Sequence, residues 1–188
     1  MKKQSKINSL FIIASILIIG LSLSNCTGNN TKNRKSQLAG MYELHIAENQ
    51  DSNGVWHEDP WTKGGTGYIV YDGLGHMAVQ ITPEGYKGFD WLSEKESIIS
   101  DRVQEKVDSM SIDELKAAVK EFSSSYVYIA NYTIEDTADI VQHHRISSSI
   151  PSVWGTTVRR AFTFSGDTLI LRILNGNRRL KWLKQNEY

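Results

Sequence analysis

Histidines are the residues of this sequence that could do acid–base or metal chemistry. His143 and His144 are adjacent, and His45, His57 and His76 are the others. Imidazole exchanges protons near neutral pH and is a common metal ligand. Adjacent residues of a strand point to opposite faces, so the pair could not bind one ion from a strand. No helical His-x-x-x-His pair or cysteine ligand set accompanies it. We therefore predict no metal and no cofactor, and interpret the pair as hydrogen-bonded structural histidines.

Arg160 carries the most informative charge. On a strand over residues 156–164 it would share a face with Val158, Phe162 and Phe164. A cation on an apolar face must be paired or hydrogen-bonded, because an isolated buried charge is very costly. Two interpretations are open. Arg160 could hold the anionic or polar head of a ligand inside the domain, or it could stack on an aromatic ring as a structural element, which is the favoured interpretation.

Aromatic residues are numerous enough to line a small-molecule pocket. Tyrosine and tryptophan combine an apolar ring with a polar tip, which suits such sites, although most rings of this kind belong to a core. The aromatic candidates are Tyr68, Tyr71, Tyr86, Trp91, Tyr128, Tyr132 and Trp154. As candidate ligand-binding residues we select Tyr68, Tyr71, His76, Tyr132, His143, His144 and Arg160.

Ordered catalytic motifs are absent from the sequence. It has no Gly-x-Ser-x-Gly elbow, no phosphate-binding glycine loop and no zincin motif. We assign no catalytic residue and favour a function other than catalysis. An enzyme that uses His143 or His144 with Arg160 and a tyrosine is the alternative, since these groups can do acid–base work.

The N-terminal residues predict export. Three lysines precede an almost unbroken apolar run over residues 10–21, and Leu23-Ser24-Asn25-Cys26 follows it. A basic head, a short apolar core and a cleavage site are typical of a secretory signal, and the run is too short for a membrane span. We predict a signal helix over residues 1–25 that is removed.

Cys26 is the only cysteine of the chain, so it cannot form an intramolecular disulfide. The residues around it resemble the bacterial lipobox, except that Asn25 replaces the usual small residue. We predict that Cys26 carries acyl chains such as palmitate, which would hold the protein on a membrane. The expected location is the bacterial cell envelope, at the outer membrane if the source has two membranes.

Charge and length limit the partners of the processed chain. Removing residues 1–25 takes three of the 21 Lys and Arg residues, so 18 remain against 21 Asp and Glu, a formal charge of −3. This mild charge does not indicate a nucleic acid partner. Residues 26–37 are polar and read as a flexible tether. We expect residues 38–188 to form one domain and the protein to be a monomer.

Most of the domain has the pattern of short strands. Alternating apolar and polar residues with glycine-containing turns between them predict eight strands, over residues 38–48, 67–72, 76–82, 127–135, 139–147, 156–164, 169–174 and 180–184. Residues 55–67 read as a loop. Such a series favours an antiparallel meander that closes as a barrel. Eight strands enclose a space that side chains fill or that holds one small ligand.

A helical insertion interrupts the strands at about residues 93–125. Ile99, Val103, Val107 and Met110 form one apolar stripe at helical spacing, and a second stripe begins at Ile112. Ser111 and Glu114 have the spacing of a capping box. We therefore predict two amphipathic helices that are broken near Ser111.

Several motifs resemble the bacterial lipocalin-like domain family. Residues 38–44, LAGMYEL, resemble its opening strand, with Tyr42 in place of the usual tryptophan. Residues 67–77, GYIVYDGLGHM, resemble its most characteristic stretch. Shorter matches lie at Tyr132, His143-His144, Gly155-Thr156, Arg160-Ala161-Phe162 and Gly166-Asp167-Thr168-Leu169. The resemblance implies a calycin-type barrel, a mainly β fold, but no agreed activity or ligand.

Three functions are compatible with these observations. The first is an envelope-tethered barrel that binds a small hydrophobic or amphipathic molecule. The second is the barrel enzyme described above. The third is a structural or interaction lipoprotein with a filled barrel. The sequence fixes which side chains face inward only up to a slip of one residue, which would invert every assignment.

Overall fold

The computed structural model describes residues 34–89 and 101–186. The predicted signal over residues 1–25, Cys26 and residues 27–33 of the predicted tether lie outside the described residues, as do residues 90–100 of the predicted insertion. None of the helices in the described ranges combines the length and the apolar character needed to cross a membrane.

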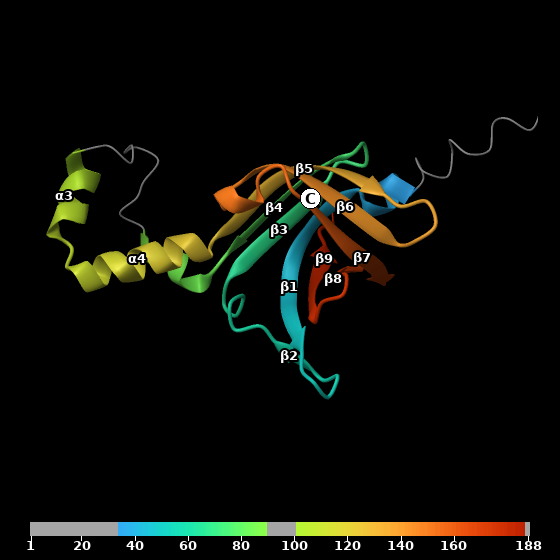
Figure 1. The fold of residues 1–188 in the computed structure, drawn as a ribbon, viewed down its shortest axis with the longest axis horizontal. Helices are drawn as coiled ribbons and strands as arrows, with labels where there is room; N and C mark the ends of the chain where they lie inside the picture. The colour runs from blue at the N-terminus through green and yellow to red at the C-terminus, as the bar shows by residue number, and fades with distance from the viewer. Residues whose placement is uncertain (1–33, 90–100, 187–188) are drawn as a thin grey trace, which may run out of the picture.

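Antiparallel strands form a closed barrel (Figure 1). Each strand pairs with the next around the ring, and β1 pairs with both β3 and β9, so β1 and β3–β9 make eight strands without a free edge. The short β2 pairs with the end of β1. The strands are β1 (Gly40–Gln50), β2 (Trp56–Glu58), β3 (Thr66–Tyr71), β4 (His76–Thr82), β5 (Tyr126–Ile134), β6 (Ile140–Ser148), β7 (Thr157–Ser165), β8 (Thr168–Ile173) and β9 (Arg178–Lys184). The mainly β, antiparallel barrel predicted from the sequence is confirmed. The prediction missed β2, which lies inside the segment interpreted as a loop.

Alternation along the strands places apolar side chains inside the barrel. In β3, Ile69 and Tyr71 are buried while Tyr68 and Val70 are exposed. β4 alternates in the same way over its whole length. Because one face of each strand packs inward, the barrel interior is the core of the protein. Its largest fully buried side chains include Trp182, Tyr42, Tyr71 and Tyr132.

Two register shifts adjust which side chains face inward. One lies on β1 between Leu44 and Ile46, opposite β9. The other lies on β6, where Ile146 is the extra residue opposite the step from Ile129 to Ala130 of β5. An extra residue in one strand bends it and changes the parity of the residues that follow. The strict alternation assumed from the sequence therefore does not extend through these two strands.

The β3–β4 hairpin shows why its glycines predict a tight turn. Asp72 Oδ1 accepts hydrogen bonds from the backbone N–H groups of Leu74, Gly75 and His76, at 2.7, 2.8 and 2.9 Å. Gly73 has φ of +75° and Gly75 of +131°, values that favour glycine. The turn chemistry read from the sequence is thus reproduced in the structure.

Helical segments lie in the connections at one end of the barrel. They are η1 (Glu84–Phe89), α3 (Asp101–Ser109), α4 (Ile112–Ser124) and η2 (Pro151–Val153). The predicted break is confirmed, because Ser111 caps α4 and the Glu114 carboxylate accepts a hydrogen bond from the Ser111 N–H at 2.7 Å. Both α3 and α4 project away from the barrel (Figure 1). Only the last turn of α4 reaches the barrel rim, where β5 begins.

The opposite end of the barrel is closed by residues 34–38. They form a short helix, and Arg34 donates hydrogen bonds to the carbonyl oxygens of Glu135 at 2.7 Å and Ala138 at 3.0 Å. Arg34 also pairs with Asp139. The last residues of the segment predicted as a flexible tether are therefore fixed to the barrel, because a guanidinium fork satisfies several carbonyl groups at once.

Candidate functional site

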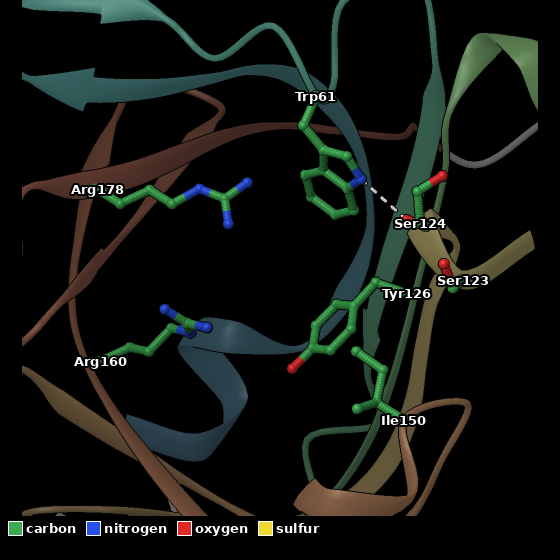
Figure 2. Close-up of a pocket in the computed structure, with 7 residues that line it drawn as sticks. All are labelled: Trp61, Ser123, Ser124, Tyr126, Ile150, Arg160 and Arg178. Carbon is green, nitrogen blue, oxygen red and sulfur yellow. Dashed lines mark hydrogen bonds between the residues drawn. The ribbon is translucent and has the colours of Figure 1, made fainter. Parts of the chain in front are cut away.

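A cavity of about 340 Å³ opens at the end of the barrel that carries the helical connections. Segments far apart in the sequence meet there. The lining comes from the loop after β2, the end of α4, the start of β5, the residue before η2, and strands β7 and β9. Figure 2 shows the seven lining residues, which are Trp61, Ser123, Ser124, Tyr126, Ile150, Arg160 and Arg178.

Trp61 forms a fixed wall of this mouth cavity. Its indole Nε1 donates a hydrogen bond to the backbone oxygen of Ser124, at 2.9 Å (Figure 2). Its backbone N–H donates to Asp59 Oδ1 at 3.0 Å. The Asp59 N–H in turn donates to the backbone oxygen of Ala47 on β1, at 2.8 Å. The glycine-rich loop is thereby held against both α4 and the barrel, so the cavity is formed before any ligand arrives.

Below the mouth cavity the barrel is nearly filled. The void in its interior measures about 20 Å³, which is room for about one water molecule. Tyr126 and Arg160 line both this void and the mouth cavity. The other walls of the void are the core residues Ile69, Val79, Ile81, Tyr128, Leu171, Leu180 and Trp182. Space for a ligand therefore lies at the mouth and not along the barrel axis.

Two arginines project into the mouth cavity (Figure 2). Arg178 lies over the Trp61 ring, 5.0 Å from its centroid. Its Nη2 is 2.8 Å from Asp59 Oδ2, an ion pair whose angles are too poor for a hydrogen bond. Arg160 has no such ring contact within the described ranges, and its Nη1 is buried without a hydrogen-bond partner. The aromatic stacking favoured for Arg160 therefore belongs to Arg178.

The sequence matches the model of the lipocalin-like domain family over residues 39–186. This chain belongs to the lipocalin-like domain family. No curated protein matches it in sequence. The matched range begins just before β1 and ends just after β9, so it includes every strand of the closed barrel. A barrel of this kind, with a cavity at its open end, is consistent with binding a small molecule.

His143 lies at the centre of the polar groups inside this lipocalin-like barrel. Its Nε2 is 2.9 Å from the Tyr71 hydroxyl, and its Nδ1 is 2.8 Å from the Tyr128 hydroxyl. Burial, and after it the positive charge of Arg160, lower the pKa of His143 to about 3. The ring is therefore neutral, with one nitrogen donating to a tyrosine and the other accepting from one.

This geometry does not favour the enzyme alternative. His143 is fully buried, both its nitrogens are occupied, and it does not line the mouth cavity. Burial also raises the pKa of Tyr128 to about 12 and that of Tyr71 well above its usual range. A ligand at the mouth could not exchange protons with this cluster without displacing the core.

The other predicted site residues lie elsewhere in the lipocalin-like barrel. Tyr132 is buried near the closed end, where its hydroxyl donates to the backbone oxygen of Lys35 at 3.3 Å. Three residues face outward. Tyr68 bonds Glu43, His76 bonds Asp72, and His144 bonds Thr133 and Thr157. Of the seven candidates only Arg160 lines the mouth cavity, with Tyr71 and His143 in the core behind it.

Sequence reasoning missed Trp61, Tyr126 and Arg178 as lining residues. A signal existed for Arg178, since it shares strand parity with the apolar residues Leu180 and Trp182. Trp61 lies in a loop, where no periodicity points to a cavity. In the two described ranges, no group of three or more histidine, cysteine or carboxylate residues has a geometry that could hold a metal ion.

Proposed function

We propose that the barrel binds a small hydrophobic or amphipathic molecule in the mouth cavity. The observation that carries this proposal is the cavity of about 340 Å³, which lies between a tryptophan, a tyrosine and two arginines. Sites for small molecules are concave, about 300–1,000 Å³ in volume, and combine apolar walls with a few placed polar groups. The mouth cavity has this size and composition.

The depth of the cavity limits the shape of the ligand. An extended acyl chain would need an apolar channel along the barrel axis, but the interior void is only about 20 Å³. Core side chains as tightly packed as these do not move aside without a cost in free energy. The ligand that fits is therefore compact, with a ring or a short branched body against Trp61 and Tyr126.

Filling the mouth cavity should weaken binding strongly. We expect the neutral fluorophore N-phenylnaphthylamine to brighten when it binds the purified protein, because the site shields it from water. Ile150 lines the cavity, and the variant Ile150→Trp should weaken this binding by about 10-fold or more, since its ring occupies the ligand volume. A fluorescence titration measures both affinities.

The matched control places the same substitution on the outer wall. Ile129 is about half exposed on β5 and does not line the cavity, so Ile129→Trp should bind the fluorophore as the unmodified protein does. Equal binding by the unmodified protein and the Ile150→Trp variant, with both folded by circular dichroism, would place the ligand site elsewhere. Absence of any binding would count against the proposed function.

We propose in addition that a lipid on Cys26 tethers the barrel to a membrane of the cell envelope. The lipobox-like residues before Cys26 and its status as the sole cysteine support this proposal. Arg34 is fixed at the closed end of the barrel. Residues 26–33 can span at most about 29 Å when fully extended, so the closed end would lie near the lipid surface and the mouth at the far end of the barrel.

Metabolic labelling tests the lipid anchor. Cells that express the full chain and are fed an alkyne-labelled palmitate should yield a labelled protein in the membrane fraction. The variant Cys26→Ser should lose the label and leave that fraction. A Cys26→Ser protein that still carried the label would refute modification at this residue.

A further inference from the structure

We infer that the molecule bound at the mouth carries an anionic group, such as a carboxylate or phosphate, that Arg160 and Arg178 contact. This inference rests on the proposed function and narrows it to one class of ligand. The positive charges around the cavity outnumber the negative charges.

Three guanidinium groups surround the inner part of the mouth. Arg160 and Arg178 line the cavity. Arg145 lies just beside it, where its Nη1 donates to the Tyr126 hydroxyl at 3.2 Å and its guanidinium lies 5.9 Å from the centroid of the Tyr128 ring. Arg145 itself does not line the cavity.

Among the described residues, one carboxylate lies within ion-pair distance of these three cations. Asp59 pairs with Arg178 at 2.8 Å. Within the ranges that the structure describes, neither Arg145 nor Arg160 has a carboxylate within 4.0 Å. The region behind the mouth therefore has an excess of positive charge. After burial, the charge of Arg160 is the next cause that lowers the pKa of His143, and it partly offsets the rise that burial produces in the pKa values of Tyr71 and Tyr128.

Each of these arginines also has a hydrogen-bond donor that is not used, although Arg145 bonds the Tyr126 hydroxyl and Arg160 lies beside the Tyr128 hydroxyl. Arg160 Nη1, Arg178 Nε and Arg145 Nε are buried and have no hydrogen-bond partner in the protein. A buried donor of a charged group that lacks a partner is unfavourable, so such groups are usually paired in folded proteins. An anionic ligand would supply the missing charge and acceptors. Arginine suits that role, because its planar fork binds the two oxygens of a carboxylate or phosphate together.

The outer face of the same barrel gives a useful contrast. Arg159, the neighbour of Arg160 on β7, points outward and forms an ion pair with Glu135. Arg179, the neighbour of Arg178 on β9, pairs with Glu48 at 2.6 Å. The two outward-facing arginines Arg159 and Arg179 thus have carboxylate partners, whereas inward-facing Arg160 has none among residues 34–89 and 101–186.

The apolar residues that line the cavity indicate the shape of the rest of the ligand. Trp61, Tyr126 and Ile150 provide apolar walls beside the two guanidinium groups (Figure 2). The void below is too small for a chain to continue into the barrel. The ligand class that fits is a compact anion with an aromatic or aliphatic ring, as opposed to a long-chain fatty acid.

Two probes of the same shape test the charge requirement. Naphthaleneacetate carries a carboxylate, and naphthaleneacetamide replaces it by a neutral amide. Isothermal titration calorimetry on the purified protein at low salt should give an affinity for the acid roughly 10- to 100-fold above that for the amide, the range expected for hydrogen bonds to a charged group. A parallel titration with naphthyl phosphate shows which anionic group is preferred.

Variants then locate the charge. Arg160→Met should remove most of the preference for the acid over the amide, and Arg178→Met should reduce this preference as well. Arg159→Met, on the outer face of the same strand, should leave both affinities unchanged. Thermal unfolding checks that each variant is folded. If either Arg160→Met or Arg178→Met does not fold, the comparison uses the other arginine variant.

The outcomes separate this inference from the proposed function. Equal binding of the acid and the amide, or a preference that survives in both arginine variants, would overturn the inference while leaving a ligand site at the mouth. Absence of binding by either naphthalene compound and by N-phenylnaphthylamine would overturn both. A preference for the acid that disappears with Arg160 supports both.

Discussion

Replacing His143 by leucine should lower the free energy of unfolding by about 3–5 kcal/mol. The substitution leaves the hydroxyls of Tyr71 and Tyr128 buried without their partner, and each unsatisfied group costs about 1–3 kcal/mol. His143 is fully buried and bonds both tyrosines, at 2.9 and 2.8 Å. The altered shape of the side chain adds a packing cost in the same direction. Urea denaturation of the purified protein measures the change.

Two controls separate the hydrogen bonds from general effects of losing a histidine. His144 is adjacent but faces outward, where it bonds Thr133 and Thr157, so His144→Leu should cost less than about 1 kcal/mol. Adding Tyr71→Phe and Tyr128→Phe to His143→Leu removes the orphaned hydroxyls and should recover part of the loss. If His143→Leu proved no more harmful than His144→Leu, the buried network would contribute little to stability.

The protein should also lose stability in mild acid, by about 3 kcal/mol between pH 6.5 and pH 4. The pKa of His143 is about 3 in the folded protein, against its usual value of 6.5. In this pH range the unfolded chain binds a proton that the folded protein does not. Stability is therefore complete above about pH 6.5 and falls by about 1.4 kcal/mol for each unit toward pH 3.

Denaturation at a series of pH values, with the His143→Leu variant in parallel, isolates this contribution. The carboxylates whose pKa values are lowered in the folded protein, such as Glu48, Glu114 and Glu135, add a loss of the same sign only as the pH approaches their usual pKa of 4.5. The window from pH 6.5 to 5 therefore belongs mainly to His143. In this window the free energy of unfolding of the variant should depend less on pH, and the difference in slope should correspond to about one bound proton. Parallel curves for the two proteins would disprove the assignment.

The barrel interior has two parts with different roles. The neutral His143 and its two tyrosines satisfy one another, so they stabilise the core. Arg160 lies closer to the mouth and has no carboxylate partner in the described chain, so it is available to a ligand. A change in the first part should alter stability, and a change in the second should alter binding.

Much of the secondary structure could be predicted because it depends on neighbours in the chain. The alternation in residues 67–72 and 76–82 is the pattern of strands with one buried face, and both strands are present. The turn at Asp72–Gly75 follows from glycine and a local side-chain acceptor. The capping box at Ser111 is likewise complete within four residues. The predictions of signal cleavage and lipidation at Cys26 concern residues outside the described structure and stay predictions.

The candidate site was less predictable, because its residues come from separate parts of the chain. Arg160 stood out on its strand, but Tyr68, His76 and His144, selected with it, face outward. The sequence does not reveal which of two adjacent histidines is inside, since a slip of one residue exchanges them. The two register shifts, at His45 of β1 and at Ile146 of β6, are such slips within single strands.

The sequence by itself therefore determined the eight strands, the helical break and the family, all of which depend on periodicity and on motifs in a fixed order. Tertiary structure alone decided that Trp61, Tyr126, Arg160 and Arg178 share one cavity, that the barrel below them is filled, and that His143 is sealed while His144 is not. The physical reason is that periodicity acts over a few residues. A cavity is the volume left after distant side chains have packed, and a charge is left unpaired only when closure of the barrel brings no acidic residue beside it.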